Sequence, residues 1–122
     1  TGVSAGPITL PATGRTLHTS IYEPSRRMLF VIGGFTKKDY SAATNRVDVF
    51  FEDKGAFSAN IDTKNFLILN APRAAFASTL QYADGLNTIL VAGGVLFPGT
   101  GTPAPTNKAE VILEVPRGST LK

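Results

Sequence analysis

The hydrophobic pattern of this chain occurs twice. The runs MLFVI at 28–32 and TILVA at 88–92 are continuously apolar, and each is followed by two glycines. Short apolar runs bounded by turn residues are typical of β-strands that are covered on both faces. The pattern therefore predicts two buried strands, one in each half of the chain, each ending in a glycine turn.

Strand-like segments flank both apolar runs. The segments RTLHTSIY at 15–22 and RAAFASTLQY at 73–82 precede the runs, and NRVDVFFE at 45–52 and NKAEVILEV at 107–115 follow them. These segments are rich in β-branched, aromatic and small residues, and turn residues separate the earlier pair from the apolar runs. Each copy therefore contains three predicted strands in the same order.

A fourth strand is expected near Phe57 or, preferably, at 65–72, where NFLILNAP is again apolar. No segment combines helical periodicity with capping residues, and SAATN at 41–45 is the only place where we allow a helical turn. Each copy thus predicts an antiparallel meander of four strands. Such a sheet cannot cover both of its own faces, so it is expected to stack on neighbouring sheets.

Further matches hold the two copies in register. When the two glycine pairs are aligned, Arg73 falls opposite Arg15 near the start of each copy, and Glu110 falls opposite Asp48 near its end. The separation between matched residues grows in one direction along the chain, as expected where strands are retained and loops lengthen. The predicted parts are an N-terminal segment with an outer-strand candidate, a first copy, and a second copy with an incomplete fourth strand, at 1–14, 15–72 and 73–122.

These matched residues resemble the kelch family of β-propellers. The shared marks are an arginine before the first strand, a glycine pair at the end of the second, and an acidic residue between apolar neighbours in the third. We assign a structural role to the residues that carry these marks, which are Arg15, Gly33, Gly34, Asp48, Arg73, Gly93, Gly94 and Glu110. The tryptophan of the family's fourth strand is absent, and Phe57 or Phe66 stands in its place. The alternative fold is a β-sandwich in which the similarity between the two halves of the sequence arose by chance.

The resemblance implies an all-β fold of two four-stranded kelch-like propeller blades, part of a larger or oligomeric propeller. A propeller ring usually needs four to eight blades, which leaves three interpretations. The chain is a piece of a longer propeller, or it forms a ring with copies of itself, or it packs against other proteins. ITLP at 8–11 occupies the place of a fourth strand, and STLK at 119–122 begins where the fourth strand of the second copy is expected. Either Ile8–Leu10 completes another blade by strand exchange, or the chain is a piece of a longer polypeptide.

Composition adds several exclusions. The chain has no cysteine, which excludes disulfides, thiolate metal sites and cysteine nucleophiles. The net charge of +3 is scattered, with adjacent basic pairs only at Arg26-Arg27 and Lys37-Lys38, so nucleic acid is not an expected partner. No apolar segment approaches the roughly 20 residues of a membrane helix. The lack of a signal sequence and of an N-glycosylation acceptor slightly favours an intracellular location.

Catalytic chemistry is not predicted. GVSAG at 2–6 matches the nucleophile elbow of serine hydrolases, but no strand precedes it and no acid and histidine follow it in order. The single histidine, His18, aligns with Phe76 and is expected to be a packed or pore-facing ring. PGTGTPAPT at 98–106 lacks the lysine of a phosphate-binding loop. We therefore expect no catalytic residue, no metal and no cofactor.

The resemblance to kelch proteins also places the loops after the glycine pairs on one face, beside the links between blades. Aromatic and charged residues on such loops are suited to protein recognition. The candidate binding residues are Phe35, Lys37, Lys38, Asp39, Tyr40, Leu96 and Phe97. We expect a non-catalytic protein-interaction or assembly module whose partners are other proteins or copies of itself. The alternatives are a glycan-binding propeller piece and a supporting part of a galactose-oxidase-like enzyme whose catalytic residues lie outside this chain.

Overall fold

The protein is all-β in a computed structural model that describes residues 14–53, 55–61, 68–97 and 102–116. No helix occurs among these described residues. The strands are β1 (Thr19–Glu23), β2 (Met28–Ile32), β3 (Val47–Asp53), β4 (Ala56–Ile61), β5 (Arg73–Ala74), β6 (Ala77–Ala83), β7 (Leu86–Ala92), β8 (Val95–Leu96), β9 (Ala104–Pro105) and β10 (Ala109–Pro116).

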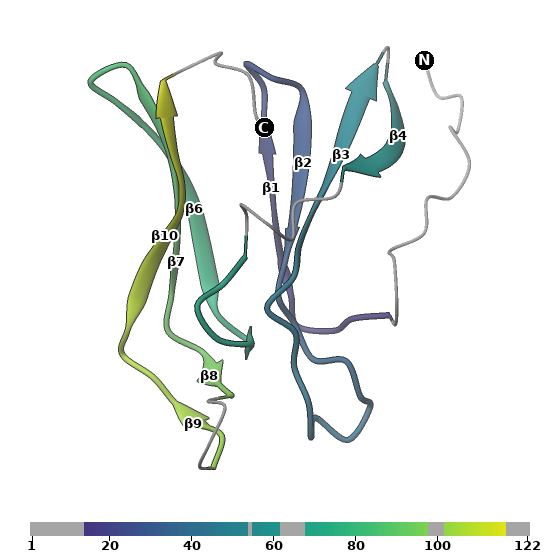
Figure 1. The fold of residues 1–122 in the computed structure, drawn as a ribbon, viewed down its shortest axis with the longest axis vertical. Helices are drawn as coiled ribbons and strands as arrows, with labels where there is room; N and C mark the ends of the chain where they lie inside the picture. The colour runs from purple at the N-terminus through teal and green to yellow at the C-terminus, as the bar shows by residue number, and fades with distance from the viewer. Residues whose placement is uncertain (1–13, 54, 62–67, 98–101, 117–122) are drawn as a thin grey trace.

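The strands form antiparallel sheets that follow the two copies in the sequence (Figure 1). The first copy gives a four-stranded sheet in the order β1-β2-β3-β4, and the second gives a three-stranded sheet in the order β10-β7-β6. The short strands form a third sheet in the order β5-β8-β9. The hairpins β1–β2 and β6–β7 close one end of the molecule, and the loops that follow β2 and β7 lie at the other end.

The short third sheet has a counterpart in the first copy. Phe35 bridges Thr16 on one side and Ala43 on the other, as β8 pairs with β5 and β9. The backbone of Gly33 donates a hydrogen bond of 3.0 Å to the Arg46 carbonyl, and Gly93 makes the same 3.0 Å contact to Lys108. The two copies of the sequence repeat therefore make equivalent backbone hydrogen bonds.

The strands expected at 15–22 and 73–82 are each broken in the structure, which corrects that part of the prediction. Leu17 and Ala75 adopt left-handed φ angles of 54° and 56°. This conformation turns the chain between the short pairing at Thr16 or β5 and the long strand that follows, because a positive φ does not fit an extended strand. Both breaks fall at the same position of the repeat.

The fourth strand and the helical turn also differ from the expectation. The first sheet takes its fourth strand from Ala56–Ile61, the alternative around Phe57, and not from the preferred segment at 65–72. Within that segment, Ile68 makes only an isolated bridge to Arg46. The SAATN segment contains a β-bridge at Ala43 in place of a helical turn. The segments 2–6, 8–11, 62–67 and 119–122 lie outside the described residues.

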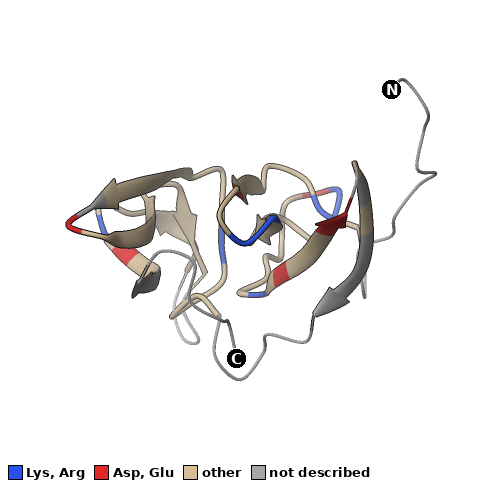
Figure 2. Ribbon diagram, turned by 90° about the horizontal axis from the view of Figure 1, so that it is seen from above, with Lys and Arg blue, Asp and Glu red and all other residues tan. Residues whose placement is uncertain are grey.

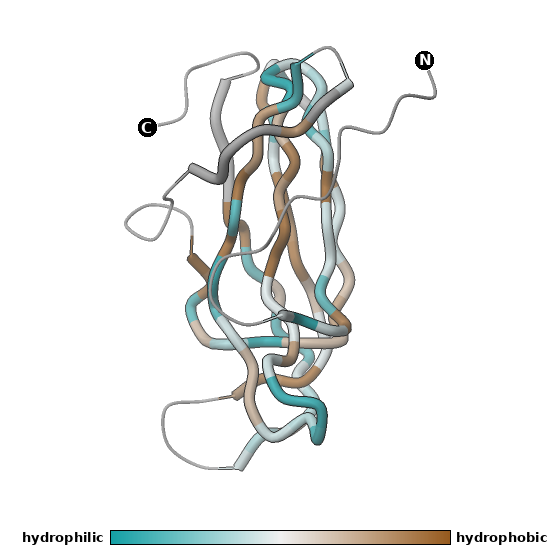
Figure 3. Tube along the Cα trace, turned by 90° about the vertical axis from the view of Figure 1, so that its right-hand side faces the viewer, coloured by the Kyte–Doolittle hydropathy of each residue, from teal (hydrophilic) through white to brown (hydrophobic). Residues whose placement is uncertain are grey.

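The hydrophobic core lies between the two larger sheets, in a contact that we call the joint. Ile21, Phe30 and Val49 lie side by side on one face of the first sheet and are buried in it. Ile89 and Val91 reach the same cluster from the second sheet, and both are fully buried. Figure 3 shows the hydrophobic segments running along the strands, as burial of an apolar core requires.

The joint brings together unlike faces of the two copies. Ile89 and Val91 correspond in the alignment to Leu29 and Val31 of β2. Neighbouring residues of a strand point to opposite faces, so Leu29 and Val31 lie on the side of β2 away from Phe30. The first sheet therefore packs in the joint through the face that carries Phe30. The second sheet packs through the opposite face of the repeat, which carries Ile89 and Val91. The two sheets are stacked front to back.

A polar contact also links the two sheets, near the β1–β2 turn. The amide of Asn87 in β7 donates a hydrogen bond of 3.1 Å to the Ser25 hydroxyl, which in turn donates to the Glu23 carboxylate at 2.7 Å. Arg26 forms an ion pair with the same carboxylate. Glu23 and Asn87 are fully buried, so this contact fixes the relative position of the sheets by hydrogen bonds whose loss would leave buried groups unpaired.

Candidate functional site: the loop face

The candidate binding residues lie in the loops that follow β2 and β7, and three of their aromatic rings meet. The Phe35 ring is 4.9 Å from the Tyr40 ring and 5.8 Å from the Phe97 ring, measured between centroids. Phe35 is buried, whereas 55% of Tyr40 is exposed. The cluster joins the loops of both copies, because Phe97 follows the second glycine pair. We call this end of the molecule the loop face.

The loop that carries Tyr40 is closed by its own hydrogen bonds. Thr36 donates its amide to the Ala42 carbonyl at 2.9 Å, and Tyr40 donates its amide to the Lys37 carbonyl at 3.0 Å. Tyr40 has a φ angle of 60°, a conformation that non-glycine residues adopt only at specific turns. The exposed tyrosine is thus held in place before any partner binds, which reduces the entropy lost on binding.

The acidic residue of this loop has a local role. The Asp39 carboxylate accepts a hydrogen bond of 3.0 Å from the Ser41 amide. Hydrogen bonds from the side chain and backbone of Ser41 lower the pKa of Asp39 below its usual value. Asp39 therefore stays ionised and serves to shape the loop.

A shallow basic hollow of about 220 Å³ lies beside the aromatic cluster. Phe35 lines it from the apolar side, and Lys37 and Lys38 line it as exposed cations. The described residues that line the hollow include no acid; they are Gly14, Arg15, Thr16, Phe35, Thr36, Lys37 and Lys38. The hollow can therefore accept a carboxylate beside an apolar group.

Leu96 is placed elsewhere. It lines a second hollow of about 270 Å³ together with Arg73, Lys108 and Glu110, where an acid faces the basic residues. The structure thus brings the candidate residues of the first loop together with Phe97. Leu96 instead lies beside the second hollow, which residues of the second copy line. Thr16 lines the first hollow and was not singled out from the sequence, because only its bridge to Phe35 brings it there.

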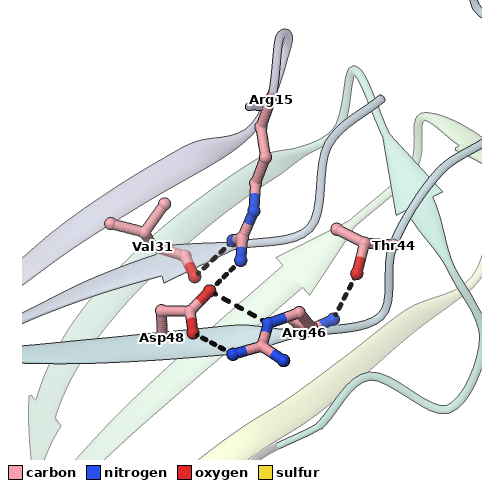
Figure 4. A network of polar contacts seen from close by, with 5 residues as sticks. All are labelled: Arg15, Val31, Thr44, Arg46 and Asp48. Carbon is pink, nitrogen blue, oxygen red and sulfur yellow. Dashed lines mark hydrogen bonds and ion pairs between the residues drawn. The ribbon is translucent and has the colours of Figure 1, made fainter. Parts of the chain in front are cut away.

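Two residues that were assigned a structural role, Arg15 and Asp48, form a buried ion pair in the first copy (Figure 4). Arg15 forms an ion pair with Asp48, and its guanidinium also donates to the Val31 carbonyl at 3.2 Å. Arg46 lies on the other side of Asp48 and donates to it at 2.8 Å. Burial, together with the nearby charge of Arg46, lowers the pKa of Arg15 to about 10. Arg15 therefore remains charged at neutral pH and holds the start of the first copy to β3.

The second copy has a looser version of this pair. Arg73 lies 3.5 Å from the Glu110 carboxylate and donates to the Lys108 carbonyl at 3.1 Å. The same carboxylate accepts a hydrogen bond of 2.9 Å from the backbone N–H of Asn70. Arg73 is buried, so both copies place an arginine against the acid of their third strand.

His18 does not pack as its equivalent does. Phe76 is buried in the joint, whereas His18 is exposed in the structure, so the first of the two expected placements, a packed ring, is wrong, and the second, a pore-facing ring, stays a prediction. Partial burial, together with the charge of Arg15, lowers the pKa of His18 below its usual value. The histidine is therefore mostly neutral near pH 7.

The described residues contain no group of three or more His, Asp or Glu side chains placed to hold a metal ion. Among the same residues, no helix has the length and apolar character needed to cross a membrane. Charged positions are spread over the ribbon in short separate bands (Figure 2).

Comparisons with protein families, with curated proteins and with solved structures give no match to this chain. The likeness to a known family therefore depends on the motif residues of the chain alone.

Proposed function

We propose that the chain is a non-catalytic protein-interaction module built from two kelch-like propeller blades, and that its loop face binds a partner protein. Front-to-back stacking supports the propeller architecture, because a stack of unlike faces leaves a further face of each kind at its two ends. The first sheet has the four strands of a blade, and the second has three among the described residues.

The observation that carries the proposed function is the exposed Tyr40 ring, which contacts the buried Phe35 ring. Phe35 in turn lines the basic hollow. Tyrosine is enriched in protein-binding hot spots because it offers a large contact area with few rotatable bonds. Its loop is closed by internal hydrogen bonds and attached to two stacked sheets, which suits recognition by a rigid surface.

The chemistry of the loop face defines the partner. Tyr40 and Phe35 offer an apolar contact, and Lys37 and Lys38 offer two cations without an acid among the described residues that line the same hollow. The partner segment is therefore expected to carry an aromatic or aliphatic side chain next to an aspartate or glutamate. The lysines are exposed, so they steer association and set its salt dependence more than they add to affinity.

The proposal is tested by selecting peptides from a random displayed library against the purified full chain. Selected peptides are expected to combine an apolar anchor with a carboxylate, and their affinity is measured by fluorescence anisotropy. Tyr40→Ala is expected to weaken binding about 30-fold, the effect of a hot-spot residue. Replacing Lys37 and Lys38 with glutamate should lower the association rate and reverse its salt dependence, because salt then screens a repulsion between like charges.

Tyr82→Ala is the matched control, because Tyr82 is also an exposed tyrosine, 41% accessible, and lies in the β6–β7 hairpin at the opposite end of the sheets (Figure 1). This control should leave peptide affinity unchanged. Selection without a shared motif, or peptide binding that is insensitive to Tyr40→Ala, contradicts the proposed loop-face function.

A further inference from the structure

The second sheet has an uncovered face whose equivalent in the first sheet is buried in the joint. Thr79, Leu90 and Val111 lie side by side across β6, β7 and β10 on the face away from the joint. They correspond to Ile21, Phe30 and Val49 of the first sheet, which are all buried against the second sheet. We call the uncovered surface the open face; its residues are Ala77, Thr79, Leu90, Ala92, Ala109 and Val111.

The open face has the character of a contact surface. None of these six residues is charged, and Val111 is 51% exposed, whereas its equivalent Val49 is fully buried in the joint. A hollow of about 130 Å³ lies over Ala77, Leu90 and Ala92. Small and apolar side chains around a hollow on a sheet face mark a place where another surface packs.

The backbone at the edge of the open face lacks a partner that the joint supplies to the first copy. Within the joint, Gly34 donates its amide to the Arg73 carbonyl at 2.8 Å. The equivalent amide, of Gly94, donates to no acceptor among the described residues. An added Cβ on Gly33 would meet the Arg73 carbonyl at 2.7 Å, whereas one on Gly93 would meet nothing closer than 3.9 Å. The open face therefore reproduces the first sheet's side of the joint without its cover.

The groups that would provide this cover are present at the other end of the stack. Arg15 corresponds to Arg73, and its carbonyl accepts no hydrogen bond from the described residues. His18 corresponds to Phe76, the ring that packs on Gly33, and it is exposed. The outer face of the first sheet thus carries the Arg15 carbonyl and the His18 ring, which are the equivalents of the two groups that cover the first sheet in the joint.

We infer that the open face binds the outer face of the first sheet of a second copy of this chain. In this contact the Gly94 amide donates to the Arg15 carbonyl of the second copy, and the His18 ring of that copy lies over Gly93. The contact is heterologous, since the two surfaces differ, so it continues to further copies until a ring closes. The inference rests on the stacked-blade architecture of the proposed function, but not on what the loop face binds.

The experiment measures the mass of the full chain by light scattering and native mass spectrometry over a range of concentrations. The wild-type chain is expected to form oligomers whose mass rises with concentration to a fixed limit. Val111→Glu places a charge at the centre of the open face, and Ser20→Glu places one on the outer face of β1. Each variant alone should be monomeric, since each retains only one competent face.

Mixing the two variants gives the decisive result. Val111→Glu retains an unaltered outer face of the first sheet, and Ser20→Glu retains an unaltered open face. One copy of each variant can therefore pair through these two surfaces, and an equimolar mixture should form one-to-one dimers and nothing larger. Thr79→Lys is a second open-face variant at an exposed position, in case Val111→Glu does not fold. Thermal melts followed by circular dichroism establish that each variant is folded.

A wild-type chain that stays monomeric up to its solubility limit overturns the inference. So does a Ser20→Glu variant that still self-associates, because the contact would then join like faces. Neither result depends on peptide binding, and Tyr40→Ala should leave the oligomers intact. Failure of the self-association is therefore distinguishable from failure of the proposed loop-face function.

Discussion

The Gly34 amide and the Arg73 carbonyl form a hydrogen bond of 2.8 Å between the two copies of the repeat. The bond joins the glycine turn after β2 to the first residue of β5, so the start of the second copy is fixed by the end of a strand in the first. Close approach of these two backbones is possible because the neighbouring residue, Gly33, has no side chain.

We expect Gly33→Ala to be much more destabilising than Gly93→Ala, although both glycines have left-handed φ angles, 59° and 73°. The backbone cost of about 1 kcal/mol is common to both substitutions. Only at Gly33 does the added methyl group clash with the Arg73 carbonyl and the Phe76 ring. The expected losses in the free energy of unfolding are about 2–4 kcal/mol for Gly33→Ala and about 1 kcal/mol for Gly93→Ala.

Urea denaturation at a concentration where the chain is monomeric measures both values. Equal losses in the two variants would mean that the close contact at Gly33 does not limit the joint.

Asp48→Asn is expected to lower the free energy of unfolding by about 3 kcal/mol, because it leaves two guanidinium groups, of Arg15 and Arg46, around a neutral amide. Glu110→Gln should cost only about 1 kcal/mol, since a single arginine faces that acid at 3.5 Å. Both substitutions preserve the shape of the side chain, so the difference between their stability losses reports the difference in charge interactions at the two sites.

Chemical denaturation compares the two variants, and Asp48→Asn combined with Arg46→Gln is the control. The second substitution removes one of the uncompensated cations, so it should recover part of the lost stability. A double variant as unstable as Asp48→Asn alone would contradict the electrostatic explanation.

The repeat, the strand order and the turning role of the glycines were accessible from the sequence because they depend on local patterns. An apolar run followed by two glycines predicts a strand and a turn wherever it occurs, and both runs form strands, β2 and β7. The marked arginines and acids were also visible, since each copy repeats them at nearly the same spacing.

Features that depend on contacts between distant residues were not accessible. Nothing in the residue types of Leu17 and Ala75 predicts a left-handed φ; the turn is imposed by the pairings on either side of it. The contact of Phe35 with Phe97 joins loops that belong to different copies of the repeat, and it follows no periodic rule. Arg46 was not recognised as a second cation on Asp48, because its position in the alternating strand pattern is typical of a solvated residue.

We expect the chain to lose stability as the pH falls below the ordinary glutamate pKa of 4.5, with Glu23 as a main contributor. Burial alone would raise the pKa of Glu23, but hydrogen bonds from Ser25 and the Arg26 ion pair outweigh it and lower the pKa. A group with a lowered folded pKa stabilises the protein above its unfolded pKa, and this contribution is lost as the pH falls through the folded value.

Thermal melts between pH 7 and pH 3 test this expectation against Glu23→Gln. The variant should be less stable at pH 7, because an amide cannot replace the ion pair, and its melting temperature should fall less steeply between pH 5 and pH 3. Parallel pH profiles for the two proteins would assign the acid sensitivity to other carboxylates.

The Phe76 ring should make a large apolar contribution to the joint. It is buried, belongs to the core cluster and lies directly over Gly33. Phe76→Ala leaves a cavity and is expected to cost about 3–4 kcal/mol. His18→Ala, at the equivalent but exposed position, should cost less than about 0.5 kcal/mol in the monomer. Because the ring couples the two sheets, unfolding of Phe76→Ala followed by circular dichroism should remain a single transition at lower urea concentration. Two separate transitions would show that the sheets fold independently and that the joint contributes little to either.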